Sequence, residues 1–367
     1  MSDPVAQSPG RIVMHVDMDC FFAAVEEREE PSLRGQPVII GADPKGGLGR
    51  GIVATCNYEA RRYGLHSAMP ISSAYRKCPQ GIYLRPRFSL YSQASRKVMD
   101  ILRQSADVLE PAGIDEAYLE VSSRGSFPAA RDLALEIRKR IQVEEKLSAS
   151  VGVGPNKLIA KIASDHRKPG GLTVVIPRRV PEFLGPKGVG ALRGVGPKTK
   201  EHLEGMGFRR ICELLAASEA GLIQEFGKFG TFLWRQARGL DDRPVDPDWV
   251  QKSIGREHTF ETDTADLGLV HSVLSACVRE VHREMTADGH WCLTLTVKAR
   301  YEGYETHFRQ TTLKQPTGSL AHLQSGALAL LEPFQRQGRR FRLIGFSVSN
   351  LVPPEDLLPL EDRGHNT

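Results

Sequence analysis

The sequence predicts an α+β protein made of several domains, and three observations support this prediction. The chain has 367 residues, 40% hydrophobic and 25% charged, which suits two to four ordinary domains better than one small core. Its first part alternates strand-like and amphipathic helix-like segments. Its middle consists of short helical segments broken by glycine, and its last part returns to a long helix and alternating strands.

The first part follows the order strand, helix, strand, strand, helix, strand. The expected elements are a strand at 11–19, a helix at 91–106, a strand pair within 108–121, a helix at 129–147 and a strand at 148–154. The segment at 21–86, with its own helix, strand and glycine-rich hairpin, is expected to be inserted early. This order predicts a ferredoxin-like sheet.

The middle segment, residues 178–240, is basic. It holds 11 Lys and Arg against 6 Asp and Glu, a net charge of +5, whereas residues 252–350 hold 12 against 10. A basic segment suggests a polyanionic partner, although a solvated helical surface explains the charge about equally well. Residues 244–251 are rich in proline and acids without periodicity, so we expect a linker there and a separate α+β domain after it.

Several classes of protein do not fit the sequence. No run approaches the roughly 18 to 20 apolar residues of a membrane helix, and the early segment RIVMHV is too short for a signal peptide, so we expect a cytoplasmic protein without a membrane partner. Six scattered cysteines without a CxxC pair indicate neither a disulfide framework nor a zinc site. The glycine-rich stretch GGLGRG has no following Lys-Ser pair and no βαβ context, which excludes a Walker loop and a dinucleotide fingerprint.

Two acidic pairs lie at strand ends. Asp115 and Glu116 would point to opposite faces of a continuous strand, so they converge only if the chain turns tightly between VLEP and AYLEV. Asp17 and Asp19 lie at alternate positions of the first strand and therefore on one face. Either pair alone is better explained by a cap, a turn or a surface pair. Together, at the ends of strands of one sheet, they favour a site for a hard divalent cation, for which Mg²⁺ is the default.

A second pattern suits phosphate. Tyr58 and Arg61 lie three residues apart, one helical turn, so that a phenol and a guanidinium face the same ligand. Lys168, just before Pro169, is placed at the start of a loop from which its ammonium can reach the same anion. The alternative is that Arg61, Arg62 and Lys168 are solvated surface charges.

Five long segments follow one another along the chain: HVDMDCFFAAVEE, ATCNYEARRYGLHSAMP, GIDEAYLEV, VGVGPNKLIAKIASDHRKPGG and KSIGREHTF. In this order and spacing they resemble a Y-family translesion DNA polymerase of the DinB or DNA polymerase IV type, and the resemblance extends from about residue 11 to 352. It implies the shape of a right hand. The implied domains are a ferredoxin-like palm at 11–20 and 87–177, small fingers at 21–86, a helical thumb at 178–243, a linker at 244–251, an α+β little finger at 252–352 and a flexible tail at 353–367.

The resemblance also implies a reaction: low-fidelity, template-directed addition of deoxynucleotides to a primer 3′-hydroxyl with two Mg²⁺ ions and without proofreading. Asp17, Asp115 and Glu116 match the catalytic and metal-binding side chains, and Met18 matches a ligand that uses its backbone carbonyl. Asp19 matches a position beside the site that is not usually a direct ligand.

The substrate contacts follow from the same motifs. Tyr58, Arg61 and Lys168 match the triphosphate contacts. Phe22 matches the steric gate, an aromatic ring under the sugar that clashes with a ribose 2′-hydroxyl. An ordinary core phenylalanine remains the alternative and suits the neighbouring Phe21.

DNA contacts are expected in the thumb and the little finger. The segment LRGVGPKTKEHL resembles a helix-hairpin-helix, which presents backbone N–H groups to a DNA phosphate. Its expected contact residues are Gly194, Val195, Gly196 and Lys198. In the last domain the expected contacts are Lys252, Arg256, Lys298 and Arg300, with exposed surface charge as a nearly equal alternative.

Three positions depart from the family pattern. Gly113 replaces a usual serine and Glu120 a usual aspartate, and neither is a metal ligand. Cys56 replaces a small residue beside the nucleotide site. In the tail, EDLLPL offers Leu358 and Leu360 but has Glu355 where a sliding-clamp peptide has glutamine, so a weakened clamp contact is the hypothesis and a disordered tail the alternative.

The expected partners are therefore primer-template DNA, deoxynucleoside triphosphates and a sliding clamp, for a monomeric enzyme. A non-catalytic DNA-binding scaffold with the same shape is the second hypothesis, and the intact Asp17, Asp115 and Glu116 favour the enzyme. A nucleotide cyclase would explain the carboxylates but not the helix-hairpin-helix or the little finger.

Overall fold

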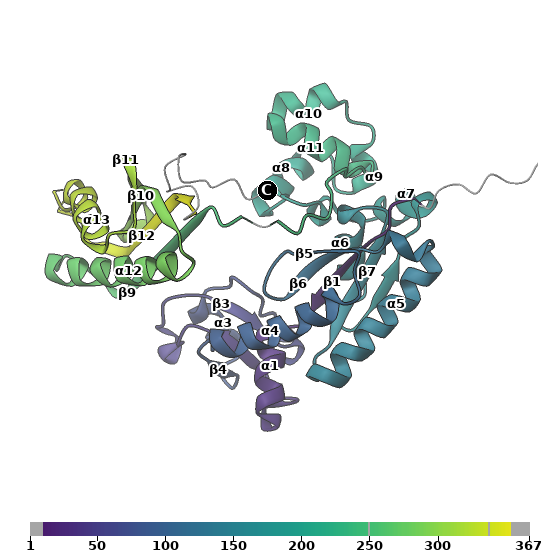
Figure 1. Cartoon of the computed structure of the whole chain (residues 1–367), viewed down its shortest axis with the longest axis horizontal. Coiled ribbons are helices and arrows are strands. Elements are labelled where there is room, and N and C mark those ends of the chain that lie inside the picture. The colour runs from purple at the N-terminus through teal and green to yellow at the C-terminus, as the bar shows by residue number, and fades with distance from the viewer. Residues whose placement is uncertain (1–9, 249, 337, 354–367) are drawn as a thin grey trace, which may run out of the picture. The chain divides into compact units, whose positions relative to one another are not determined.

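The computed structural model describes residues 10–248, 250–336 and 338–353, which form two compact units (Figure 1). Among the described residues, the first unit includes 10–48 and 52–248, and the second includes 49–51 and those from 250 onward. The clamp-binding peptide expected at 355–360 lies outside the described residues. No helix within the described ranges is long and apolar enough to span a bilayer.

A five-stranded sheet forms the centre of the first unit, in the order β5-β6-β1-β7-β8. Its strands are β5 (Val108–Pro111), β6 (Glu116–Glu120), β1 (Val13–Met18), β7 (Ala149–Gly154) and β8 (Leu172–Val174). The first three neighbouring pairs are antiparallel, and β8 joins β7 in parallel. The first four strands have the ferredoxin-like order, which confirms the predicted fold class, and β8 extends the sheet at one edge.

Helices cover both faces of this palm sheet. Met14 and Val16 point into the main core, which also contains residues of α4 (Phe88–Arg103) and α5 (Phe127–Arg140). The opposite face is covered by α6 (Lys157–His166), which packs on β1 and β7. All six residues of β1 are consequently buried, as expected of a central strand with both faces covered.

A glycine lets α6 lie close to the sheet. A Cβ on Gly152 of β7 would lie 2.1 Å from the carbonyl oxygen of Ala160 and 2.3 Å from the amide nitrogen of Ser164, both in α6. Only a residue without a side chain fits there. The close approach brings the side chains of α6 against those of β1.

The fingers are inserted between β1 and α4. They begin with α1 (Phe21–Glu29) and contain a second sheet in the order β3-β2-β4. The remaining elements are β2 (Val38–Gly41), β3 (Val53–Cys56), α2 (Tyr58–Arg61), α3 (Ile71–Lys77) and β4 (Ile82–Leu84). A small core that includes Ile39, Val53 and Ile71 holds this sheet and its helices together.

Five helices follow the palm. They are α7 (Val180–Leu184), α8 (Pro197–Gly205), α9 (Ile211–Leu214), α10 (Glu219–Phe226) and α11 (Lys228–Ala237). Helices α8 to α11 each contribute one fully buried leucine to a common core, namely Leu203, Leu214, Leu222 and Leu233. The expected helix-hairpin-helix consists of a single 3₁₀ turn (Val189–Ala191), a glycine turn and α8, so its first helix is shorter than the motif suggests.

The first part of the expected linker is held by the palm. Val245 is buried with Val13 and Tyr118, and the Lys157 ammonium lies 3.3 Å from the carbonyl oxygen of Pro244. Residues 244 and 245 therefore contact the palm, although the sequence suggested a solvated linker from 244 onward.

The second unit is a four-stranded antiparallel sheet in the order β11-β10-β12-β9, with two helices. Its elements are β9 (Ser253–Thr264), α12 (Leu267–Ala287), β10 (Trp291–Tyr301), β11 (Thr306–Thr317), α13 (Leu320–Gln335) and β12 (Phe341–Val352). In β10, Leu295 and Val297 are buried in the core formed with the helices, whereas Thr296 and Lys298 alternate with them and are partly exposed. One face of the sheet is thus open, as in many antiparallel sheets.

Candidate active site

The three predicted acids converge at one end of the palm sheet. Asp17 of β1 and Glu116 of β6 are directly paired across neighbouring strands. Asp115 precedes Glu116 in the turn between β5 and β6, and its carbonyl oxygen accepts a hydrogen bond from the Met18 N–H at 2.9 Å. The tight turn expected from the sequence is present and places both members of the acidic pair beside the end of β1.

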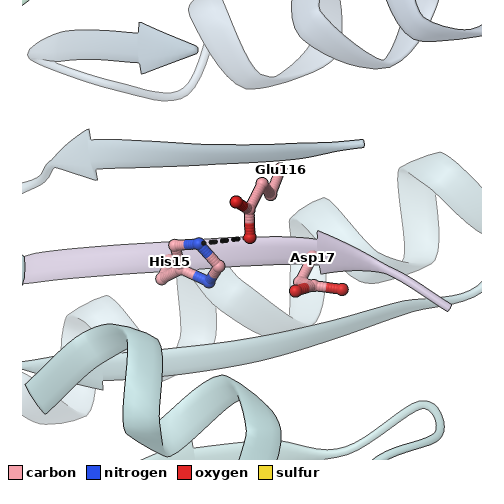
Figure 2. A group of neighbouring side chains, drawn as sticks. All are labelled: His15, Asp17 and Glu116. Atoms are coloured by element: carbon pink, nitrogen blue, oxygen red, sulfur yellow. Dashed lines mark ion pairs between the residues drawn. The ribbon is translucent and has the colours of Figure 1, made fainter. Parts of the chain in front are cut away.

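His15 is a member of this cluster that the sequence analysis missed. Ligand atoms of His15, Asp17 and Glu116 all lie within 4.8 Å of one another. Figure 2 shows the imidazole beside Glu116, with Nε2 at 3.3 Å from Glu116 Oε2. Its Nδ1 lies 2.8 Å from Ser164 Oγ, and the side chain has no exposed surface. Only its position two residues before Asp17, on the same face of the strand, could have indicated it.

Two lysines pair with the acids. Lys161 of α6 bridges two strands, because its Nζ lies 2.7 Å from Asp17 Oδ2 and 2.7 Å from Glu116 Oε2. Lys168 Nζ lies 2.7 Å from Asp17 Oδ1 and 2.7 Å from Asp165 Oδ1. Lys168 was expected to contact a phosphate, whereas Lys161 was not expected to take part at all.

The environment shifts the pKa values of the adjacent Asp115 and Glu116 in opposite directions. Burial, followed by the charges of Asp17 and Glu116, raises the pKa of Asp115 to about 6. Hydrogen bonding from His15, followed by that from Lys161, holds the pKa of Glu116 well below its ordinary value. Burial lowers the pKa of His15. Burial also opposes the charge of Lys161, but Asp17 and Glu116 outweigh it and raise the pKa of that ammonium.

This group suits a divalent cation. Carboxylate oxygens are the ligands that Mg²⁺ prefers, and here they come from two paired strands and an adjacent turn. The raised pKa of Asp115 indicates that its ionised form lacks sufficient compensating positive charge in the protein alone. Asp19 does not belong to the group, because its carboxylate accepts hydrogen bonds from Ser148, Ser150 and the amide of Gly170.

Two of the expected nucleotide contacts, Tyr58 and Arg61, lie in the fingers. Tyr58 and Arg61 are both in α2, and the guanidinium carbon of Arg61 lies 4.9 Å from the centre of the Tyr58 ring. Arg61 Nε donates to the carbonyl oxygen of Cys56 at 3.2 Å, and the guanidinium side chain is otherwise exposed. The two side chains therefore contact each other, and their expected contact with a common phosphate ligand stays a prediction.

Phe22 and Phe21 have different environments. Phe21 is buried in the palm core at 3% exposure, whereas Phe22 is only partly buried. The Phe22 ring stacks on Tyr91 of α4 with a centroid distance of 4.3 Å and an interplanar angle of 12°. Phe21 is thus the core residue, and Phe22 is the partly exposed one, as a steric gate would need to be.

Comparisons with known proteins place this geometry in a family. The impB/mucB/samB family model matches residues 16–165, and the model of that family's C-terminal domain matches residues 251–357. DNA polymerase IV of Methanoculleus marisnigri is 47% identical over 341 residues, which cover 93% of this chain and 94% of the relative. DNA polymerase IV 2 of Methanosarcina mazei is 45% identical over 345 residues, or 94% and 93% of the two chains.

This chain is a Y-family DNA polymerase of the DNA polymerase IV type. Among solved structures, a Y-family polymerase chimera, Dbh-Dpo4(243-245)-Dbh, matches with a TM-score of 0.86 at 32% identity, covering 93% of this chain and 99% of the chimera. An insertion ternary complex of Dbh DNA polymerase matches with a TM-score of 0.67 at 31% identity and the same coverage. The predicted resemblance and the predicted enzyme class, a DNA-directed DNA polymerase of translesion synthesis, are confirmed, and the scaffold hypothesis is not favoured.

A cavity of about 610 Å³ adjoins the acids of this polymerase. Glu116, Tyr118 and Lys161 line it from the palm, and Lys187 and Arg193 line it from the thumb side. Its charged lining residues are Lys161, Lys187, Arg193 and Arg243 together with Glu116 and Asp165, among apolar residues such as Leu158 and Ile162.

The glycine turn of the polymerase thumb has the expected features. Gly194 has φ +83°, and a Cβ there would lie 2.8 Å from the Phe229 ring, so glycine is required. Gly196 is the N-cap of α8 and offers no side chain to its first amides, while Lys198 is exposed in the first turn. Val195 is partly buried between the two glycines.

The four residues expected to contact DNA in the little finger do not all face the same way. Lys298 and Arg300 alternate with buried residues of β10 and lie on the open face, and Lys252 is exposed just before β9. Arg256 lies two residues after the buried Ile254 of β9, on the same face, and pairs with Glu280 and Glu284 of α12. It therefore lies on the side of the sheet that bears the helices.

Proposed function

We propose that this polymerase transfers deoxynucleotides to a primer 3′-hydroxyl at Asp17, Asp115 and Glu116, which hold two Mg²⁺ ions with the help of the Met18 carbonyl. One observation carries the proposal: the direct pairing of Asp17 with Glu116 across β1 and β6, with Asp115 in the adjoining turn. When bound, magnesium supplies Lewis-acid activation of the hydroxyl and neutralises charge on the phosphates.

The palm residues would act by position and charge. Asp17 and Glu116 are fixed to the sheet ladder, so their separation is set before any substrate arrives. Glu116 is kept ionised by His15 and Lys161, which ensures a charged ligand at neutral pH. The role of His15 is to orient Glu116 from a side that substrate does not reach.

Arg61, Tyr58 and Lys168 would bind the triphosphate. Arg61 presents a guanidinium with several donors, which suits multidentate contact with phosphate oxygens. Lys168 already lies at the acids through Asp17, so an incoming phosphate at that position finds its ammonium within reach. Together these side chains would hold the nucleotide between fingers and palm.

Phe22 would exclude ribonucleotides. Its ring is supported from behind by the stack on Tyr91, which leaves little freedom to retreat from a 2′-hydroxyl. The clash would select deoxyribose without a hydrogen bond to the sugar.

Primer-template DNA would be held by two surfaces described separately. The uncapped amides at the start of α8, around Gly194, Val195, Gly196 and Lys198, suit a backbone phosphate. In the little finger, Lys298, Arg300 and Lys252 suit further phosphates, Lys298 by exchanging its present partner Glu257. Arg256 would not join them, because it lies on the helix-bearing side of the sheet with Glu280 and Glu284. Such contacts do not read base identity, as copying of damaged templates requires.

We further propose a cytoplasmic monomer that meets a sliding clamp through residues 355–360. The motif has Glu355 in place of glutamine and retains Leu358 and Leu360. Unchanged clamp binding after deletion of residues 355–367 would contradict this part of the proposal.

Primer extension tests the reaction. Purified protein with a primed template, deoxynucleotides and Mg²⁺ is expected to extend the primer, and Asp115→Ala is expected to abolish extension while the far-ultraviolet circular dichroism spectrum stays unchanged. Extension by the variant at the wild-type rate would refute the assignment of the acids. No extension by a folded, DNA-binding wild type would favour the scaffold.

The gate has its own test. Phe22→Ala is expected to admit ribonucleotides that the wild type rejects, with Phe21→Leu as a core substitution that leaves discrimination unchanged. Equal ribonucleotide incorporation by Phe22→Ala and wild type would move the gate to another residue.

A further inference from the structure

The Lys161 ammonium lies where the carboxylates of two strands converge. It contacts one oxygen of Asp17 and one of Glu116, each at 2.7 Å. The other oxygen of Asp17 pairs with Lys168 at 2.7 Å. Both oxygens of Asp17 are therefore engaged by ammonium groups in the protein alone.

A divalent cation that binds Asp17 and the Glu116 oxygen facing it must take these oxygens over from Lys161. Mg²⁺ is bound by oxygens at about 2.0–2.1 Å. An ammonium hydrogen-bonded to the same two oxygens occupies the space between them, so the two cations cannot be accommodated at once. Binding of the metal therefore requires Lys161 to leave at least one carboxylate.

The surroundings of the two nitrogen-bearing side chains beside Glu116 show which one can leave. His15 has no exposed surface and is held between Ser164 and the Tyr118 ring. The Lys161 side chain is 32% exposed and lines the cavity of about 610 Å³. Lys161 therefore has room to move, and His15 does not.

A second acid is available to Lys161 after it moves. Asp165 lies one turn further along α6, with its Oδ2 at 3.7 Å from Lys161 Nζ, and it also lines the cavity. Rotation of the flexible lysine side chain can keep this contact while it gives up Asp17 and Glu116. The displaced charge would then face the cavity.

We propose that Lys161 is an exchangeable counter-ion of the catalytic acids: it holds Asp17 and Glu116 together in the metal-free enzyme and must be displaced for a divalent cation to bind. The inference rests on the proposed metal site. It makes Lys161 a positioning residue that weakens metal binding in the absence of nucleotide, in contrast to a residue that assists it.

Direct metal binding tests this inference without an activity assay. Free Mn²⁺ is measured by electron paramagnetic resonance during titration of the full chain in the absence of nucleotide and DNA. Lys161→Met is expected to bind Mn²⁺ roughly tenfold more tightly than the wild type, because a competing charge is removed. Lys97→Met, which removes an exposed lysine paired with Glu145, is the matched control and is expected to bind like the wild type.

Further variants separate the possible failures. Lys161→Gln retains a donor without the charge and replaces Lys161→Met if that variant is unfolded without metal. Unchanged or weaker Mn²⁺ binding by the folded variant overturns the exchange. Asp17→Asn is expected to lose Mn²⁺ binding at the site. If this variant binds Mn²⁺ like the wild type, the proposed metal site itself is wrong. If Asp17→Asn loses Mn²⁺ binding but the Lys161 variants do not bind Mn²⁺ more tightly, only the exchange is refuted.

Discussion

Asp115 should destabilise the metal-free enzyme, and its removal should therefore stabilise the fold. Raising its pKa from 3.8 to about 6 corresponds to roughly 3 kcal/mol of unfavourable free energy for the ionised form in the folded protein. Solvent screening of this partly exposed side chain lowers the figure, so we expect Asp115→Asn to increase the free energy of unfolding by about 1–3 kcal/mol at pH 8.

The pH dependence has a definite sign. The folded protein binds the proton more tightly than the unfolded chain, so the destabilisation is absent below the unfolded pKa and grows as pH rises from 3.8 through about 6. The gain from Asp115→Asn should therefore be about half as large at pH 5 as at pH 8.

Urea denaturation in EDTA at both pH values measures this effect. Asp132→Asn, which removes an exposed carboxylate of α5 paired only with its neighbour Arg131, is the control and should change stability by less than about 0.5 kcal/mol. A variant Asp115→Asn that is no more stable than the wild type at pH 8, or whose advantage is the same at pH 5, would refute the reasoning.

Two further substitutions test the packing around the site. Gly152→Ala would place a Cβ 2.1 Å from the Ala160 carbonyl oxygen, so we expect urea denaturation to show a free energy of unfolding lower by about 3 kcal/mol or more. Gly205→Ala, with open space around it, should be neutral or slightly stabilising. Equal effects of the two substitutions would show that α6 does not need the close approach. Lys157→Met removes a buried ammonium from its partner Glu110 and should lower the free energy of unfolding by about 3 kcal/mol. It should also speed proteolysis between thumb and little finger, whereas Lys97→Met should have neither effect. Proteolysis of Lys157→Met at the wild-type rate would show that other contacts hold the linker.

Much of the palm could be predicted because its determinants are local. The order of apolar strands and amphipathic helices indicated the ferredoxin-like sheet, and the incompatibility of Asp115 and Glu116 with one straight strand indicated the turn. The lysine at the acids could not be found in this way, because Lys161 reaches Asp17 only through the packing of α6 on β1, some 140 residues apart in sequence.

The same limit explains two other differences. Arg256 looked equivalent to the basic residues of β10, but its direction depends on which alternating set of β9 residues the helices cover. The docking of Val245 on the palm depends on a buried cluster with Val13 and Tyr118, which a short stretch of prolines and acids does not reveal.

The chain leaves the palm to form the fingers and returns to it at one place. Glu26 in the first helix after β1 accepts hydrogen bonds from Arg87 and from the Tyr91 hydroxyl, where the chain returns. Phe22 stacks on the same Tyr91. The ring that we propose as the sugar gate is thus anchored at the root of the insertion. On this proposal, the remainder of the fingers would adapt to a distorted template base without a change in the check on the sugar.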